Sequence, residues 1–311
     1  MANVGFQTIA EFSELVVEQF QHRWGAAIAA AQKFNEFTQE IIVDQEGVII
    51  PFINSWEGLK EIGLHDNPTG TTFVAEYMQA EIKRFNRFAV ASVYDWADAK
   101  SRSLVMNQLD AIVAEGAFLR SRRIIRALQL GDTSAIQAYD GQNLFSNSHT
   151  VNGNSFDNLL TGLSLNTSGF NQARLRLQQI PLGPDGTYLP TEGATFTLII
   201  PPALDVDAEL LLNSTTIYED NKNATNPMKS AAQKIVSNQL TDDNDWYLLM
   251  SLGSIKPFVT VKHSTSTDSL IPFIADTDLN VVKNKLYEWH LDKIENTVPV
   301  HFYQMVKVVN S

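Results

Sequence analysis

Apolar and polar residues alternate with a helical period over residues 100–130. The apolar positions fall on one side of a helix, and they are Val105, Leu109, Ile112, Leu119, Ile125 and Leu128. No proline interrupts the stretch, and Gly131 follows it as a typical helix stop. The pattern therefore predicts a single helix that is about 45 Å long. Such a helix is either a long core helix with a solvated end or a spine along which subunits of an assembly are ordered.

A second helical pattern lies near the N-terminus, over residues 8–33. Thr8 and Glu11 have the spacing of a capping box, and Val16, Phe20 and Trp24 mark an apolar side. A terminal helix of this kind can pack on its own domain or reach a neighbouring copy. We favour the second interpretation.

Between these two helices the pattern changes to strands and turns. Residues 41–43 and 48–53 are strand-like, and a strong loop signal covers residues 66–70. Residues 71–94 predict two strands with a turn at residues 84–87, although the first half also fits a helical period. A projecting hairpin buries little surface alone, so this arm is expected to need a partner.

The remainder of the chain mixes short strands and helices, so the fold class is α+β. An irregular, polar passage over residues 139–168 precedes a short helix that Ser168 can cap. A buried strand at residues 195–200 leads through Pro201 into a helix that ends near residue 213. Further strands are predicted at residues 234–237, 246–250, 258–262, 285–294 and 299–309.

Composition excludes several classes of protein. The chain has 311 residues, a formal net charge of −12 and no cysteine, so it has neither disulfides nor thiolate chemistry. No basic face suited to binding DNA phosphates is evident from the sequence. We find no signal peptide and no stretch of about 20 apolar residues that could span a membrane, and we expect the protein to stay in a cytoplasm.

Catalytic and metal-binding motifs are also missing from the sequence. His149 lies in a polar loop near Asp140, where a hydrogen-bonded turn histidine is expected rather than a catalytic one. His290 alternates with Glu288 and Asp292 on a predicted strand, which favours a cross-strand charge pair over a general base. We therefore expect no enzyme activity, no cofactor and no metal. A soluble enzyme with a site around His149 and Asp140 is kept as an alternative.

Several short motifs then occur in a familiar order. They are DGQNLFSNSH at residues 140–149 with Asn158-Leu159 after it, LIIPPAL at 198–204, LLNS at 211–214, NPMK at 226–229, DWYLL at 245–249 and IKPF at 255–258. Together they resemble the major head subunits of Mu-like tailed phages, and a weaker counterpart lies at residues 55–61. The resemblance covers roughly residues 50–309. Met228 and Ser230 replace leucine and glycine of the family pattern, residues 83–88 match poorly, and residues 291–294 differ from the family.

The resemblance implies the Hong Kong 97 type capsid fold, which is an α+β fold. It predicts an N-terminal arm at residues 1–39, an extended loop (E-loop) at 40–94, a peripheral domain with the spine helix at 95–202, an axial domain at 203–280 and returning strands at 281–311. Copies would assemble as hexamers and pentamers into the icosahedral head of a tailed phage and enclose double-stranded DNA. Implied partners are a separate scaffolding protein, a portal at one vertex and a cement or decoration protein. An encapsulin-like cellular shell is the main alternative.

Contacts between copies would use the arm, the loop and the basic end of the spine. The candidates are Trp24, Lys83, Arg84, Arg87, Arg120, Arg122, Arg123 and Arg126. The last four crowd the predicted end of the spine helix, where cations complement the helix dipole. The alternative for these arginines is a solvated helix end. Lys83 and Asn86 could in principle form an isopeptide crosslink, but nothing in the sequence singles them out, and we do not expect one.

Overall fold

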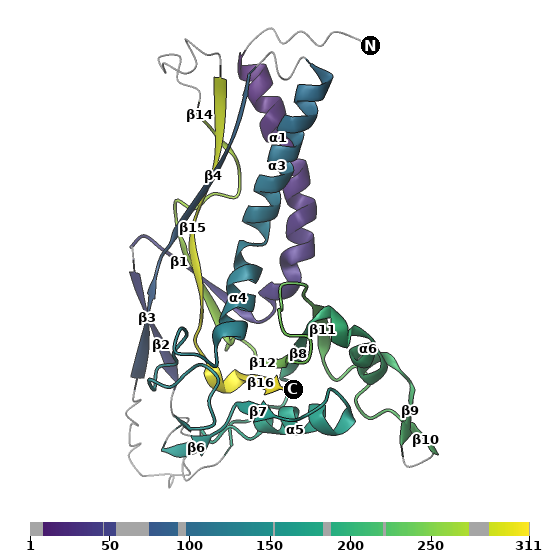
Figure 1. The fold of residues 1–311 in the computed structure, drawn as a ribbon. Helices are drawn as coiled ribbons and strands as arrows, with labels where there is room; N and C mark the ends of the chain where they lie inside the picture. The colour runs from purple at the N-terminus through teal and green to yellow at the C-terminus, as the bar shows by residue number, and fades with distance from the viewer. Residues whose placement is uncertain are drawn as a thin grey trace, which may run out of the picture.

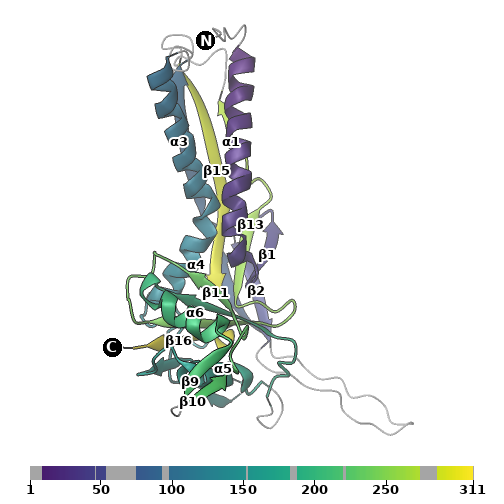
Figure 2. The same ribbon diagram turned by 90° about the vertical axis from the view of Figure 1, so that its right-hand side faces the viewer.

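The computed structural model describes residues 9–45, 47–53, 75–92, 98–151, 153–182, 188–219, 222–273 and 286–310. The molecule has a tall upper part and a broader lower part (Figure 1). In the upper part, the helices α1 (Ile9–Ala31) and α3 (Ala99–Ala117) run side by side along a long sheet. Figure 2 shows both helices in front of strand β15 (Leu286–Pro299), so they cover one face of that sheet.

The predicted spine is broken at Phe118. Helix α3 ends at Ala117, and α4 (Leu119–Leu130) follows after Phe118 leaves the helical region with φ −94° and ψ 8°. The break follows Gly116, which has a low helix propensity and lies against other elements of the fold. At the start of α3, the Asp98 carboxylate accepts a hydrogen bond of 3.0 Å from the Ser101 N–H. The expectation of one continuous helix was therefore wrong in detail, although both segments lie in the predicted range.

Helix α1 packs on its own chain, and its contact with a neighbouring copy stays a prediction. Its residues Val16, Phe20 and Trp24 are buried in a cluster with residues of α3 and of the sheet. The other members of the cluster are Ala89, Ala91, Val105, Leu109, Ile112, Val113, Leu270, Tyr287, Trp289 and Leu291. Burying a large apolar side chain stabilises a fold by about 1.5–3 kcal/mol, so this cluster fixes α1 firmly. Thr8 of the predicted capping box lies outside the described residues.

The upper sheet is organised around β15. This strand pairs antiparallel with β4 (Arg84–Ser92) over its first part and with β13 (Phe258–His263) over its last part. β14 (Ile271–Phe273) pairs with its other edge, and β1 (Thr38–Val43) extends the sheet in parallel with β13. The turn predicted at residues 84–87 was wrong, because the pairing of β4 with β15 already begins at Arg84, opposite Ile294.

A two-stranded ribbon stands beside this sheet, formed by β2 (Gly47–Ile53) and β3 (Ala75–Glu81). Part of β3 was the segment that also fitted a helical period, and the structure makes it a strand. The ribbon lies within the range predicted for the E-loop. Residues 54–74, which include the weak motif at 55–61, lie outside the described residues.

The lower part is built on a second sheet with the strand order β11, β8, β12, β16, β7. These strands are β11 (Gln233–Val236), β8 (Thr195–Ile200), β12 (Trp246–Ser251), β16 (Met305–Val309) and β7 (Leu159–Thr161). All six residues of β12 are buried, as expected for a central strand. The helices α5 (Thr167–Gln178) and α6 (Asp205–Asn213) pack around the sheet, and β9 (Thr216–Glu219) pairs with β10 (Lys222–Thr225) in a small hairpin.

Short elements complete the fold. They are the 3-10 helices η1 (Gln32–Asn35), η3 (Pro202–Leu204) and η4 (Phe302–Gln304), and the strand pair of β5 (His149–Val151) and β6 (Asn154–Phe156). Helix α5 is capped by Asn166 and not by Ser168 as predicted, because the side-chain oxygen of Asn166 accepts a hydrogen bond of 2.9 Å from the Gly169 N–H.

The predicted domain ranges can be compared with the cores. The boundary between residues 202 and 203 falls inside one hydrophobic core, because β8 and α6 both contribute to the core of the lower part. β13 was assigned to the axial range, yet it pairs with β1 and β15 of the upper sheet. The domain ranges themselves stay a prediction.

Candidate functional site

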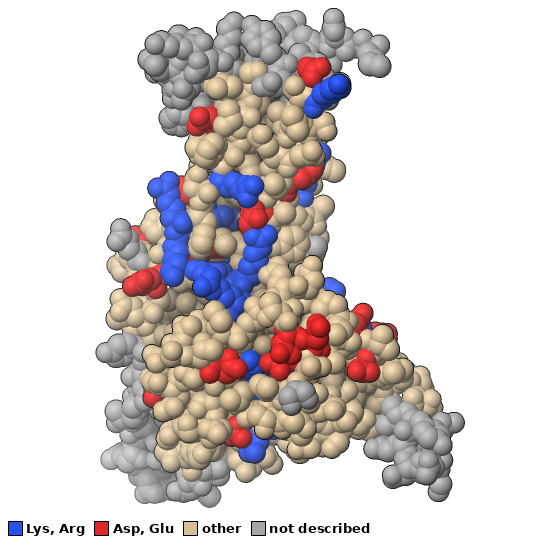
Figure 3. Space-filling model, in the orientation of Figure 1, with Lys and Arg blue, Asp and Glu red and all other residues tan. Residues whose placement is uncertain are grey.

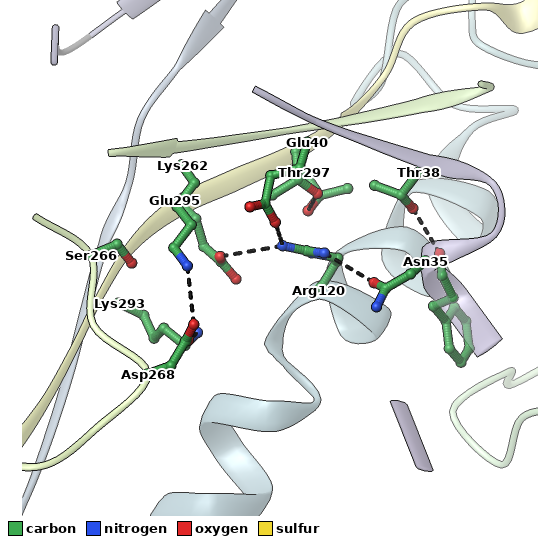
Figure 4. A network of polar contacts seen from close by, with 12 residues as sticks. Asn35, Thr38, Glu40, Arg120, Lys262, Ser266, Asp268, Lys293, Glu295 and Thr297 are labelled. Carbon is green, nitrogen blue, oxygen red and sulfur yellow. Dashed lines mark hydrogen bonds and ion pairs between the residues drawn. The ribbon is translucent and has the colours of Figure 1, made fainter. Parts of the chain in front are cut away.

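A polar network joins four elements where the upper and lower parts meet (Figure 4). At its centre, Arg120 of α4 donates a hydrogen bond of 2.9 Å to the side-chain oxygen of Asn35 at the end of η1. The same guanidinium donates to Glu40 of β1 over 2.6 Å. It also lies 3.7 Å from the carboxylate of Glu295 on β15. Arg120 therefore links the N-terminal segment, the spine and the long strand within one chain.

A second cluster of charges lies next to Arg120. Asp268 forms ion pairs with Lys262, over 3.0 Å, and with Lys293. Burial favours the neutral acid, but the two lysines outweigh it and hold the pKa of Asp268 below its ordinary value. The Lys293 ammonium lies 5.0 Å from the centre of the Trp24 ring, which is a cation–π contact.

A small cavity of about 190 Å³ lies between these two clusters, and Trp24 and Glu295 both line it. Glu295 is only 4% exposed, and its Oε2 atom has no hydrogen-bond partner apart from the ion pair with Arg120. Removing one member of such a buried pair leaves an uncompensated charge, which is strongly destabilising. The network therefore fastens α1 and α4 to the sheet.

Five arginines from two elements gather on the surface above this network. We call them the arginine belt, and they are Arg84 and Arg87 of β4 and Arg122, Arg123 and Arg126 of α4. Figure 3 shows the basic side chains grouped over α4 and β4 on an otherwise mixed surface. The sequence did not indicate this basic face, because about 40 residues separate its two halves.

Two carboxylates lie within the belt. Glu115 of α3 forms ion pairs with Arg122 and, over 3.8 Å, with Arg87. Asp292 of β15 accepts three hydrogen bonds from Arg84, two from Nε over 2.9 and 3.1 Å and one from Nη2 over 2.5 Å. This bidentate ion pair raises the pKa of Arg84 and holds the pKa of Asp292 below its ordinary value.

The other two arginines of the belt have no such partner among the described residues. Arg123 donates to the Asn296 side chain over 3.1 Å and lies over the Phe85 ring at 5.3 Å, but its Nε atom is buried without an acceptor. Burial and the neighbouring charge of Arg126 both lower the pKa of Arg123. Arg126 is exposed.

The break at Phe118 also changes the electrostatics of these arginines. We expected them in the last turns of a long helix, but Arg120, Arg122 and Arg123 lie in the first half of α4, which has no basic residue in its last turn. The favourable interaction with the carboxyl end of the helix is therefore absent.

The predicted contact residues have different surroundings in the subunit. Trp24 is 5% exposed and is used inside the chain, as is Arg120. Lys83 is exposed, and its backbone carbonyl accepts a hydrogen bond of 3.0 Å from the Glu295 N–H. The arginine belt brings together five of the eight candidates. Contact of any of the eight with another copy stays a prediction.

The residues of the first sequence motif hold one another in place through hydrogen bonds and ring stacking. The buried His149 ring is 2.8 Å from Asp140 and 3.2 Å from the Leu144 carbonyl, and it stacks on Phe302 with 4.0 Å between ring centres. Burial favours neutral Asp140, but hydrogen bonds from His149 and from two backbone N–H groups hold its pKa below the ordinary value. The expectation of a hydrogen-bonded, structural histidine is confirmed, although His149 begins strand β5 and does not lie in a turn.

Two buried asparagines have structural roles that we did not predict. Asn158 donates to the backbone carbonyls of Leu144 and Phe302 and accepts a hydrogen bond from the Ser146 N–H. Asn226 donates to the Leu211 carbonyl over 2.7 Å and to the Ser214 carbonyl over 3.0 Å. The signal was present, because both asparagines belong to the short motifs that carried the resemblance.

The other residues that we considered for catalysis also form structural contacts. His290 lies 3.4 Å from Glu288 on its own strand, whereas the expected cross-strand charge pair is formed by Asp292 with Arg84. Within the described residues, no group of three or more His, Asp or Glu side chains could hold a metal ion. None of the helices in that part of the chain is long and apolar enough to cross a membrane.

Comparison with known proteins defines the class. The family model described as phage capsid protein matches residues 84–280. A procapsid subunit of bacteriophage JBD30 has a similar fold, with a TM-score of 0.53 and 15% identity over 98% of this chain and 76% of that chain. A structure of Mycobacterium phage Patience has a TM-score of 0.53 and 12% identity over 96% of this chain and 88% of that chain.

A virus-like particle from Pyrococcus furiosus is similar as well, with a TM-score of 0.51 and 13% identity over 94% of this chain and 98% of that chain. No curated protein matches the chain. At such identities the structures establish the fold alone, whereas the family match covers more than half of the sequence.

The fold and the family match together define a capsid subunit of a tailed phage. The chain belongs to the phage capsid protein family. It is a major capsid protein with the Hong Kong 97 type fold, as the sequence motifs led us to expect, and the encapsulin-like alternative is not favoured. A capsid subunit is a structural protein.

Proposed function

We propose that this capsid protein assembles as hexamers and pentamers into an icosahedral head that encloses double-stranded DNA. The observation that carries the proposal is the match to the phage capsid family over residues 84–280, in a chain whose spine and long strand have the capsid arrangement. The protein would act without catalysis. Its place is the capsid of the virion, after assembly in the host cytoplasm.

The charge of the chain fits the enclosure of DNA. A net charge of −12 disfavours tight binding of DNA phosphates, which would obstruct the entry of DNA into the head. Many modest contacts between copies can still hold a shell together, because multivalency multiplies weak interactions. Assembly would use a separate scaffolding protein and a portal at one vertex, and a cement or decoration protein could cover the outer face.

Electron microscopy of particles from infected cells, combined with nuclease treatment, tests this proposal. We expect icosahedral particles in which this chain forms every hexamer and pentamer and in which double-stranded DNA is protected from nuclease. Particles that consistently enclose a protein cargo and no DNA would contradict the enclosure of a genome.

A further inference from the structure

We propose that the arginine belt docks on the exposed acidic surface of a second copy of this chain. The proposal rests on the proposed function, since it names one contact through which copies would associate. It concerns the residues Arg84, Arg87, Arg122, Arg123 and Arg126.

The belt has more positive charge than its own subunit neutralises. Among the described residues, Glu115 and Asp292 form ion pairs with Arg84, Arg87 and Arg122. Arg123 is held by a neutral amide and an aromatic ring, and one of its N–H groups is buried without an acceptor. A buried donor without an acceptor destabilises the subunit, and an incoming anion can offset this in part by pairing with the rest of the guanidinium.

The isolated subunit gains little from keeping Arg123 and Arg126 together. Arg123 and Arg126 repel each other, and the first half of α4 lacks the favourable field of a helix carboxyl end. The surplus of cations also occurs in a chain whose overall charge is −12, so the solubility of the chain does not require it. An anionic partner that binds the belt would offset this repulsion.

A second copy provides suitable anions. Exposed acidic residues of the lower part include Asp207 of α6, and Asp242 and Asp243 between β11 and β12. Figure 3 shows acidic side chains gathered on the lower part, apart from the basic group above. Arginine forms bidentate pairs with carboxylates, so a few such pairs would fix the orientation of the two copies as well as attract them.

The belt suits separate carboxylates better than a DNA backbone. A phosphodiester chain has a negative charge at every step and would lie against Glu115 and Asp292 as well as against the arginines. Carboxylates on a folded surface can instead be placed at individual guanidiniums. The observations therefore favour the second copy.

Charge reversal at one exposed position of the belt tests the proposal. Arg126→Glu should leave the circular dichroism and melting temperature unchanged and lower the yield of shells from purified protein at least tenfold. Lys100→Glu is the matched control, because Lys100 is exposed at the start of α3, outside the belt, and gives the same change in charge. It should assemble like the wild type. If Arg126→Glu were to misfold, the neutral variant Arg126→Gln would test the same contact, with a smaller expected loss in the yield of shells.

Compensation then identifies the partner. Adding Asp207→Lys and Asp243→Lys to the Arg126→Glu chain should restore assembly to within about threefold of the wild type. The proposal is overturned if Arg126→Glu assembles normally, if the acidic-side reversals fail to restore it, or if its shells form fully but protect less DNA, which would assign the belt to nucleic acid. A wild-type protein that forms no shells would instead contradict the proposed function.

Discussion

Gly116 and Trp24 fit together without room for a further atom. A Cβ atom on Gly116 would lie 2.8 Å from Cζ3 of the Trp24 ring and 2.5 Å from Cδ2 of Leu291. The indole of α1 therefore rests on the glycine at the end of α3, beside the long strand. This contact fixes the N-terminal helix next to the break in the spine.

Gly116→Ala should destabilise the protein for this reason. An overpacked core contact costs about 1–3 kcal/mol, and the gain in helix propensity offsets part of it. Gly25→Ala is the control, since nothing lies within 4 Å of its Cβ position in α1, and it should stabilise by about 0.5–1 kcal/mol. Urea unfolding of the unassembled subunit measures both. Equal effects of the two substitutions would contradict the close contact.

Arg120→Gln should weaken the junction of the spine with the sheet. Among the described residues, the substitution removes the ion pair of Arg120 with the buried Glu295 and its ion pair with Glu40. We expect the free energy of unfolding to fall by about 1–3 kcal/mol. This is less than for a fully buried pair, because the Arg120 side chain is 20% exposed and solvent screens its charge. Arg126→Gln, on the same helix but exposed, should change it by less than about 0.5 kcal/mol. Matching losses would show that the network does not stabilise the subunit.

His301 should make the subunit sensitive to acid. Burial lowers the pKa of His301 from 6.5 to about 4, and the ring accepts or donates a hydrogen bond of 2.9 Å with Tyr303. Because the unfolded chain then binds the proton more readily than the folded chain, stability is complete above pH 6.5 and falls as the pH drops toward 4. Protonation of this one residue should lower the free energy of unfolding by about 3 kcal/mol as the pH falls through this range.

Unfolding measured between these two pH values checks the prediction. His301→Gln should lower stability at neutral pH and remove part of the slope between pH 4 and 6.5. A variant that keeps the full slope would show that other groups cause it.

Ser230→Gly should stabilise the subunit. Ser230 has φ 59°, in the left-handed region that favours glycine, and the family pattern has glycine at this position. Relief of the backbone strain outweighs the larger entropy of the unfolded glycine chain, and we expect a gain of about 0.5–1 kcal/mol. Calorimetry should show a higher melting temperature, and a lower one would mean that the serine side chain stabilises this turn.

The sequence was most informative where the pattern is local. The helical period of residues 100–130 located the spine, but it could not show the break, because neither Phe118 nor Gly116 excludes a helix and the close contacts of Gly116 with Trp24 and Leu291 form only in the fold. The turn at residues 84–87 was misplaced for a similar reason. The register of β4 against β15 depends on a strand about 200 residues further along the chain.

The same limit applied to the candidate site. Arg120 and its neighbours were recognised as a basic group, yet their partners Glu40 and Glu295 lie far away in sequence. The arginine belt arises only when β4 and α4 come together in the fold. His149, in contrast, was interpreted correctly because its partners Asp140 and Leu144 are close in the sequence.

Negative-stain electron microscopy of the purified chain, combined with light scattering, tests the central claim most directly. We predict closed, round shells of uniform size with a mass of many subunits. A monomer or small oligomer under conditions in which the chain is folded would contradict the assignment of this protein as a self-assembling capsid subunit.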